Sequence, residues 1–405
     1  MEETYKDLKD LSLQDKAVYV PVQYFDISLN AEGKSSRPPA LLFTLDNLIS
    51  IKKYVRWAFA RPVDISAVEE FLGYRDSGIN GLQPVDIQAL HQEVVQHALD
   101  WQALEQGSKR LGIELDIFGK KFVGVGQAII TFIKQTEAYK QYGSLDDLKE
   151  EEIEALQNYP LSETDRTSIR YIQEFLTIAK DDIARYQSKV AAVRALAREF
   201  ARKITEAILP KVRQKRAIAD REGLEETIAG YVESLRDLEG QVAEKIAEYN
   251  QNVGYALSGL LFGPIGVAVT GGIYGSKAEQ IRYEKNEMLN QTAEIIELLR
   301  VKRPLLSSLN GLSLYLEDVA SRLGETEHAS KNLEDVWQII AAYVEASLTE
   351  LNAIDDSQRL VIFSLRFSRV ITPWETIQGH AEQLSKLFNE ALEASTSTTA
   401  NPISK

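Results

Sequence analysis

The sequence has no cysteine, and histidine and methionine are scarce: its 405 residues include 4 His and 2 Met. Without cysteine, disulfides, thiolate nucleophiles and cysteine-based zinc sites are excluded. No two histidines are three or four residues apart, so a metal site on one helix is unsupported. We expect them to be isolated polar residues on helix surfaces: His91, His97, His328 and His380. No nucleophile motif is present either, so we expect no enzyme and no cofactor.

An excess of positive charge is also missing. The formal net charge is −14, which argues against nucleic acid as a partner because phosphate binding needs a basic surface. With 44% hydrophobic and 26% charged residues, the composition is that of a folded protein. The first residues, MEETYKDLKDLSLQDK, lack an apolar run, so no Sec signal peptide is visible and release would need lysis or another route.

Strand signals are sparse, and residues 17–28 are the best candidate. Helical patterns are common in the first part of the chain. One helix is predicted over 39–59 and a short one over 63–74, and Pro84 opens a helix that runs to about Gln106. A further helix, rich in glycine and β-branched residues, is predicted as a buried helix of a bundle over 122–133.

The clearest pattern is a heptad stripe that begins after Ser162, a candidate N-cap. The stripe resumes at Leu224 beyond Pro210, where we expect a kink, and continues to Tyr249. As one helix, 162–249 would be roughly 130 Å long. Its first part has apolar residues three or four apart: Ile169, Ile172, Leu176, Ala179, Ile183, Tyr186, Val190, Val193, Ala197, Phe200 and Ile204.

A second periodic run starts at Lys277 and is broken at Pro304. Gly223 and Pro304 would lie at similar heights in an antiparallel pair of helices, so a shared bend is expected there. Further helices are predicted over 329–352 and 357–394. The fold class is therefore an all-α elongated rod with a helical bundle at one end, a long antiparallel coiled-coil stalk and an apolar hairpin at the tip.

The chain divides accordingly. Residues 1–160 would form N-terminal helices of the bundle and 161–250 the long stalk helix. Residues 251–276 would form the hydrophobic hairpin and 277–325 the returning stalk helix. C-terminal helices over 326–394 would rejoin the bundle, and 395–405 would be a disordered tail.

The stretch NVGYALSGLLFGPIGVAVTGGIYGSK (252–277) carries no charge until Lys277. A turn is the natural interpretation of Phe262-Gly263-Pro264 near its middle. Each of the two arms would then have about 10 residues and a length of about 15 Å, half of a ~30 Å hydrocarbon core. This predicts a hairpin that dips into one leaflet. The alternative is a hairpin buried in a globular core.

Two sets of residues carry the membrane prediction. The glycines form the turn and allow close helix packing in lipid, and the aromatic residues at both ends suit an interface. The predicted membrane-contacting residues are Tyr255, Leu257, Leu260, Leu261, Phe262, Pro264, Ile265, Val267, Val269, Ile273 and Tyr274. The predicted turn and packing glycines are Gly259, Gly263, Gly266, Gly271 and Gly275.

A basic run follows Pro210: Lys211, Arg213, Lys215 and Arg216. Two interpretations remain open. The run could contact an acidic partner or lipid headgroups, or it could be the solvated face of a kinked stalk.

The long coiled coil, the terminal bundle and the uncharged glycine-rich hairpin together resemble the ClyA-type α-helical pore-forming toxins. Within that family the sequence is similar to the A components of binary cytotoxins of the XaxA and YaxA kind. The resemblance covers essentially the whole chain, but it is a pattern of hydrophobicity and contains no fixed catalytic motif.

The resemblance implies a bacterial cytolysin component that is released as a soluble monomer. It would bind the lipid membrane of a target cell, recruit a second (B) component and assemble into an oligomeric lytic pore. The short-armed hairpin suits a supporting role, because a channel wall needs one polar face. The competing hypothesis is a non-lytic coiled-coil scaffold or tether with a monotopic membrane anchor.

Overall fold

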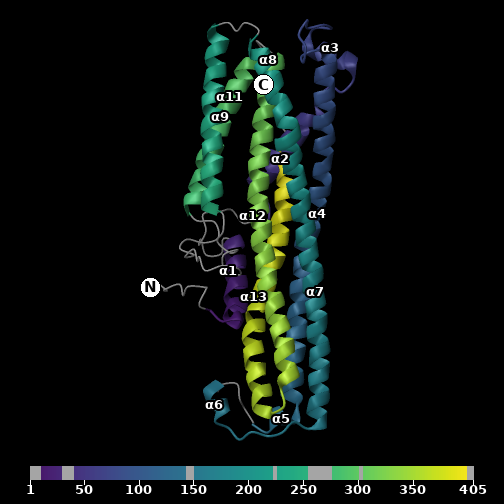
Figure 1. Cartoon of the computed structure of the whole chain (residues 1–405), viewed down its shortest axis with the longest axis vertical. Helices are drawn as coiled ribbons and strands as arrows, with labels where there is room; N and C mark the ends of the chain where they lie inside the picture. The colour runs from purple at the N-terminus through teal and green to yellow at the C-terminus, as the bar shows by residue number, and fades with distance from the viewer. Residues whose placement is uncertain are drawn as a thin grey trace.

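The computed structural model describes residues 11–29, 41–142, 150–221, 226–253, 276–300 and 304–398. Across these ranges the secondary structure is helical, apart from one isolated β-bridge between Pro160 and Asp356. The molecule is elongated, and its long helices run along one axis (Figure 1). The prediction of an elongated all-α fold is confirmed.

Four long helices form the body, which we call the rod: α4 (Pro84–Gln135), α7 (Glu163–Arg202), α12 (Pro304–Ala353) and α13 (Ser357–Thr398). Helix α4 packs against α7 and α13, and α12 packs against α7. The rod has an aromatic core in which buried rings meet edge to face. The ring centroids of Phe118 and Trp337 are 4.6 Å apart, and those of Phe122 and Trp374 are 4.8 Å apart.

Helix α7 confirms the heptad prediction. Ser162 and Asp165 form a capping box, with the Ser162 hydroxyl accepting a hydrogen bond from the Asp165 amide. All the stripe residues from Ile169 to Ile204 that were predicted to be apolar contacts are buried. The stripe faces α4 and α12, so the two-helix stalk seen in the sequence is here part of a thicker bundle.

Helix α4 differs from the prediction, because one helix spans the two segments that the sequence suggested. Its glycines do not break it, and three of them, Gly112, Gly119 and Gly126, face α13. A Cβ on Gly126 would lie 2.6 Å from the Ile371 side chain, and one on Gly119 would lie 3.5 Å from the Cα of Gln378. Close approach of α13 explains these glycines better than a helix boundary does.

The predicted kink at Pro210 takes the form of a π-helix, η2 (Lys203–Ile208), and the helix continues as α8 (Leu209–Arg221). Proline lacks an amide donor and clashes with the carbonyl four residues earlier. A wider turn directly before Pro210 relieves that clash and keeps the helix continuous.

The predicted strand at 17–28 is wrong, because α1 (Leu13–Leu29) is a helix with Pro21 inside it. Ala17, Val20 and Tyr24 are buried on one face, and α1 packs against α12 and α13. Packing of this apolar face against α12 and α13 therefore outweighs the β-branched composition.

Shorter helices complete the bundle. Helix α2 (Leu45–Phe59) begins after the N-cap Thr44, later than predicted, and α3 (Ile65–Leu72) ends at Gly73, which has φ +75°. Helices α5 (Glu137–Lys140) and α6 (Glu150–Glu154) lie near the opposite end (Figure 1).

Helix α12 (Pro304–Ala353) joins the part of the predicted stalk helix beyond Pro304 to the helix predicted over 329–352. Helix α13 extends to Thr398, so the first residues of the predicted disordered tail are helical. The rest of that tail, 399–405, lies outside the described residues.

Candidate functional site

The predicted membrane hairpin is flanked by α9 (Glu226–Val253) and α11 (Ser276–Arg300). Every predicted membrane-contacting residue and glycine, from Tyr255 to Gly275, lies outside the described residues. The helices on both sides do locate the ends of this segment. Helix α9 packs along α11, and Lys245 Nζ lies 2.6 Å from a Glu284 carboxylate oxygen. Eight residues from this pair, towards the C-terminus of α9 and the N-terminus of α11, this antiparallel register places Val253 opposite Ser276.

The predicted continuous helix over 162–249 is wrong. Arg216 at the end of α8 donates hydrogen bonds of 2.5 and 2.9 Å to Glu239 of α9. In one straight helix these residues would be about 35 Å apart. The chain therefore reverses between Arg221 and Glu226, and α9 runs back along the rod.

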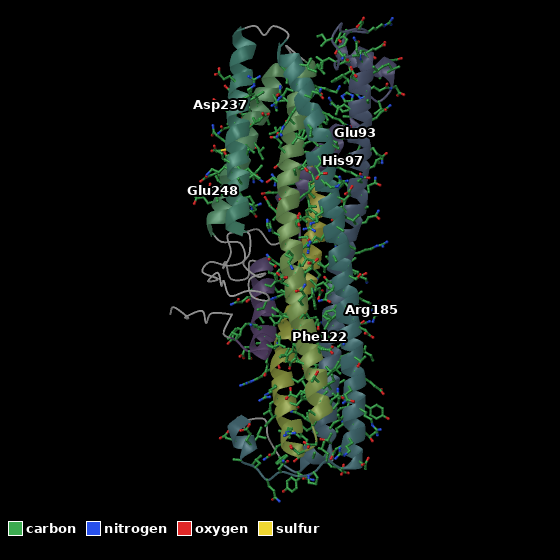
Figure 2. All side chains as sticks on the ribbon, viewed as in Figure 1. Glu93, His97, Phe122, Arg185, Asp237 and Glu248 are labelled. Carbon is green, nitrogen blue, oxygen red and sulfur yellow. The ribbon has the colours of Figure 1, made fainter. Side chains whose placement is uncertain are left out.

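A second reversal separates α11 from α12, where the Ser307 hydroxyl donates a 3.0 Å hydrogen bond to the Ile296 carbonyl. Both reversals lie at the same end of the rod (Figure 1). The expected shared bend near Gly223 and Pro304 is thus a full reversal of the helix pair. In Figure 2, Asp237 and Glu248 mark the course of α9 from that end back along the rod. We call α9 and α11 together the folded-back pair. Its free end, at Val253 and Ser276, lies part-way along the rod and not at its tip (Figure 1).

Apolar contacts also join the folded-back pair to the rod. Val242 of α9, Leu289 of α11 and Leu314 of α12 form a small buried cluster, with Ile246, Met288 and Ile296 packed around it. This cluster is separate from the main core, although Leu235, Tyr249 and Ile281 of the pair belong to that core.

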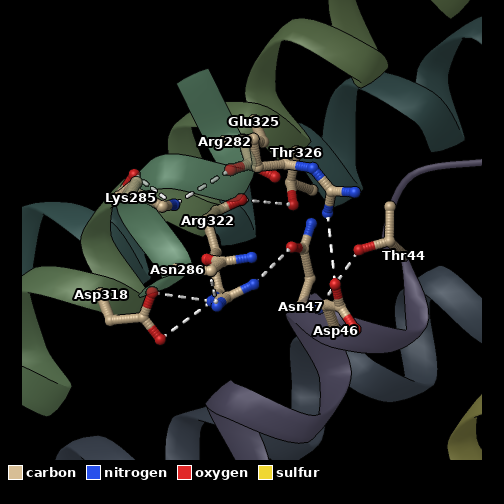
Figure 3. Close-up of polar contacts among 11 residues, drawn as sticks. Thr44, Asp46, Asn47, Arg282, Lys285, Asn286, Asp318, Arg322, Glu325 and Thr326 are labelled. Atoms are coloured by element: carbon tan, nitrogen blue, oxygen red, sulfur yellow. Dashed lines mark hydrogen bonds and ion pairs between the residues drawn. The ribbon is translucent and has the colours of Figure 1, made fainter. Parts of the chain in front are cut away.

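Towards Ser276, α11 also meets the rod through a group of charged and amide side chains, most of them buried (Figure 3). We call this group the charged junction: Asp46, Asn47, Arg282, Lys285, Asn286, Asp318, Arg322 and Glu325. Lys285 Nζ lies 3.3 Å from a Glu325 carboxylate oxygen, and the two side chains are only 2% and 1% exposed. Arg282 approaches Asp46 of α2 at 3.6 Å.

Arg322 is the centre of the charged junction. Its Nε donates to both carboxylate oxygens of Asp318, at 2.8 and 2.9 Å. Its two terminal nitrogens donate to Asn47 of α2 and Asn286 of α11, each at 3.2 Å. One guanidinium therefore connects three helices, a role that suits its planar fork of donors.

Burial and charge act in opposite directions on these groups. Burial lowers the pKa of Lys285, although Glu325 opposes the shift. Burial alone would raise the pKa of Asp318, but Arg322 and Lys285 hold it below its usual range. The charged forms in the charged junction are therefore favoured only while each charge stays next to its opposite charge.

In the basic run after Pro210, Lys211 and Arg213 are exposed, as the solvated-face interpretation expects, but their charges are also paired within the chain. Lys211 forms an ion pair with Glu93 of α4 at 2.7 Å, and Arg213 forms one with Glu317 of α12 at 2.8 Å. Lys215 donates to the Gly81 carbonyl at 2.7 Å. Together with the Arg216–Glu239 pair, these contacts fasten α8 to its neighbours. The sequence could not supply the acidic partners, which are distant along the chain.

Two of the histidines also differ from the prediction, because His91 and His97 are buried. His97 Nε2 lies 2.9 Å from the Phe200 carbonyl, which can only accept, so Nε2 carries the proton and donates it. The other ring nitrogen, Nδ1, is then unprotonated and accepts from the Tyr54 hydroxyl at 2.7 Å. His91 Nδ1 lies 2.9 Å from the Pro62 carbonyl. Burial lowers the pKa of His97 and that of His91, the latter to about 4.

His328 and His380 are not on open surface either. Burial lowers the pKa of His328, and His380 Nδ1 lies 3.5 Å from an Asp26 carboxylate oxygen. Among the residues that the structure describes, no cluster of potential ligands could hold a metal ion. No helix within the described ranges is long and apolar enough to cross a membrane.

Comparisons with known proteins identify solved structures with a similar fold. No protein-family model and no curated protein matches the sequence. Among solved structures, soluble SmhA of the tripartite α-pore-forming toxin Smh from Serratia marcescens is 12% identical, with a TM-score of 0.54 over 96% of this chain and 98% of that one. YaxA from Yersinia enterocolitica is 28% identical, with a TM-score of 0.49 over 88% of this chain and 100% of that one.

XaxA from Xenorhabdus nematophila is 24% identical, with a TM-score of 0.46 over 88% of this chain and 99% of that one. The fold is the one that SmhA, a component of an α-pore-forming toxin, also has.

Proposed function

We propose that this protein is a component of an α-pore-forming cytolysin and that residues 254–275 are its membrane-binding segment. The fold shared with SmhA supports the toxin class. The single observation that carries the membrane role is the register of the folded-back pair. Lys245 pairs with Glu284, so the uncharged segment leaves and re-enters the fold at adjacent points. Such ends suit a hairpin that enters and leaves a bilayer on the same side.

The proposal includes a partner and an assembly. SmhA belongs to a tripartite toxin, so a second component encoded with this protein is the expected partner. The soluble chain would be released from its cell, bind the membrane of a target cell and assemble there into an oligomeric lytic pore. The sequence predicted a hairpin over 251–276; because α9 ends at Val253 and α11 begins at Ser276, we propose 254–275 as the segment.

Dye release from liposomes tests the function. The protein is added to loaded vesicles, alone and with its candidate second component, and Leu261→Glu is compared with wild type. A charge in the bilayer interior is costly, so we expect Leu261→Glu to abolish release without changing the helical circular dichroism spectrum.

A matched control is Leu196→Glu, the same change at a leucine of α7 that is 39% exposed to water. We expect this control to retain release. Release by Leu261→Glu equal to that of wild type would refute insertion of the segment. Vesicle binding without leakage under every pairing would instead favour the non-lytic tether.

A further inference from the structure

A buried histidine joins three helices of the rod. His97 of α4 is 2% exposed, and its ring stacks on the Phe200 ring of α7, with the two centroids 4.0 Å apart. Its Nε2 donates to the Phe200 carbonyl at 2.9 Å, and its Nδ1 accepts from the Tyr54 hydroxyl of α2 at 2.7 Å. Both ring nitrogens are therefore occupied, and the hydrogen bond to α2 exists in this form only while Nδ1 is unprotonated.

His97 also holds α4 to the start of the π-helix. Phe200 lies three residues before η2, whose first residue, Lys203, pairs with Asp100 of α4 at 2.9 Å. This level lies towards the end of the rod at which the chain reverses (Figure 2). The imidazole is enclosed, whereas the side chains of Lys203 and Asp100 are 42% and 35% exposed. The charges beside the ring can therefore be changed by substitutions outside the core.

Protonation affects one of the two hydrogen bonds of His97. An imidazolium donates from both nitrogens, so the bond from Nε2 to the Phe200 carbonyl persists. Nδ1–H then points at the Tyr54 hydroxyl, which keeps its own proton because burial raises the pKa of Tyr54. That hydroxyl has to turn, and it loses the nitrogen to which it donated. A buried donor without its acceptor and a buried charge are both unfavourable, so protonation weakens the contact between α2 and α4.

The surroundings of His97 set the pH at which it takes up a proton. Burial lowers the pKa of His97. Asp100 and Glu93 of α4 raise that pKa, and Lys203 of η2 lowers it. The groups that face the ring from α2 and α7 are uncharged, a hydroxyl and a carbonyl. An opened form has the ordinary histidine pKa of about 6.5 and binds the proton more readily, so the closed contact loses stability as the pH falls below that value.

We propose that the Tyr54–His97 contact is a pH-sensitive switch that holds the C-terminal half of α2 against α4 and α7 near neutral pH and releases it in acid. The start of α2 stays in place, because Arg322 still donates to Asn47. Helices α4 and α7 stay together, since the bond to the Phe200 carbonyl and the apolar stripe of α7 do not depend on Nδ1. This inference concerns the protein by itself and goes beyond the proposed function.

Two measurements over a series from pH 8 to pH 4.5 follow the proton and the motion. Nuclear magnetic resonance of the imidazole groups gives the His97 midpoint, because the chain has 4 histidines and the His97 signal is the one missing from His97→Gln. Spin labels at Lys53→Cys on α2 and Ala195→Cys on α7, both exposed positions in a chain without cysteine, give a distance. We expect wild type to gain a population with a longer label separation as His97 titrates, below about pH 6.5.

His97→Gln is the first control. A glutamine amide can donate to the Phe200 carbonyl and accept from the Tyr54 hydroxyl, but it does not titrate. The label separation in this variant should be the same at every pH of the series. If the separation lengthens in His97→Gln as it does in wild type, the motion belongs to another group and the switch is overturned.

Two further variants separate the effect of charge from that of structure. Asp100→Asn and Lys203→Met break the same exposed ion pair, but they remove charges that act on His97 in opposite directions. Asp100→Asn should lower the pH midpoint of the motion by about half a pH unit, and Lys203→Met should raise it by about as much. A shift of about this size corresponds to one charge acting over several ångströms near a protein surface.

The direction of these two shifts decides the inference, whether or not His97→Gln folds. Loss of the ion pair by itself affects both variants alike, so midpoints that move in the same direction, or that do not move, would overturn the switch. A wild-type label separation that stays constant while the His97 signal titrates would also overturn it. Opposite shifts, shared by the His97 signal and the label separation, are the result that the switch requires.

Discussion

The aromatic core of the rod and the centre of the charged junction, at Lys285, Arg322 and Glu325, are both buried, but one is apolar and the other is charged. In the core, Trp337 packs between Phe118, Tyr186 and Trp374, with ring centroids 4.6, 4.9 and 5.5 Å away. In the junction, Arg322 and Lys285 meet carboxylates and amides. Apolar burial stabilises with little regard to direction, whereas buried charges demand particular partners. The comparison indicates that apolar packing stabilises the rod, whereas the buried ion pairs fix the position of the folded-back pair.

The largest effect is expected in the aromatic core. Trp337→Ala removes a fully buried indole and should lower the free energy of unfolding by about 3–5 kcal/mol. Chemical denaturation followed by circular dichroism measures it. Tyr283→Ala, at a residue 67% exposed, should change stability by less than about 0.5 kcal/mol. Equal losses for the two variants would remove the distinction between core and surface.

A smaller loss is expected at the junction. Arg322→Met leaves Asp318 buried without its cation and should cost about 3 kcal/mol in the same denaturation experiment. The comparison becomes sharper with Arg322→Met/Asp318→Leu, which should recover most of that loss because both charges are gone. If the double variant is less stable than the single one, the junction stabilises the fold through its charges and the contrast with the core fails.

The smallest effect is a pH dependence. His91 has a folded pKa of about 4, below the unfolded value, because burial disfavours its charged form. The unfolded state then binds more protons between these two values, so stability is highest above pH 6.5 and falls as the pH drops towards 4. Between pH 7 and pH 5, wild type should lose about 1–2 kcal/mol more than His91→Gln.

Unfolding free energies at pH 8, 7 and 5 check this. At pH 8 the difference between the two proteins should equal that at pH 7, since the imidazole is neutral in both states. Parallel pH profiles down to pH 5 would show that His91 is not the group responsible.

The sequence determined the helices and much of their internal chemistry. The heptad stripe of α7, from Ile169 to Phe200, is buried as predicted, and Ser162 caps it as predicted. These features depend on residues within a few turns of each other, so local spacing is sufficient to predict them. The uncharged character of 254–275 is equally a property of the sequence alone.

Only the tertiary structure decided how the helices are arranged. The apolar stripe that includes Val242 could be buried in a straight stalk or in a folded-back pair, because both arrangements bury the same heptad spacing. The hydrogen bond between Arg216 and Glu239 shows that the pair is folded back. Residues 17–28 form a helix because their apolar face packs against α12 and α13. Lys285 and Arg322 look like ordinary solvated charges in the sequence. Their burial depends on partners such as Asn47 and Glu325, which approach only after the chain has folded, and a buried charge is tolerated only where those partners meet.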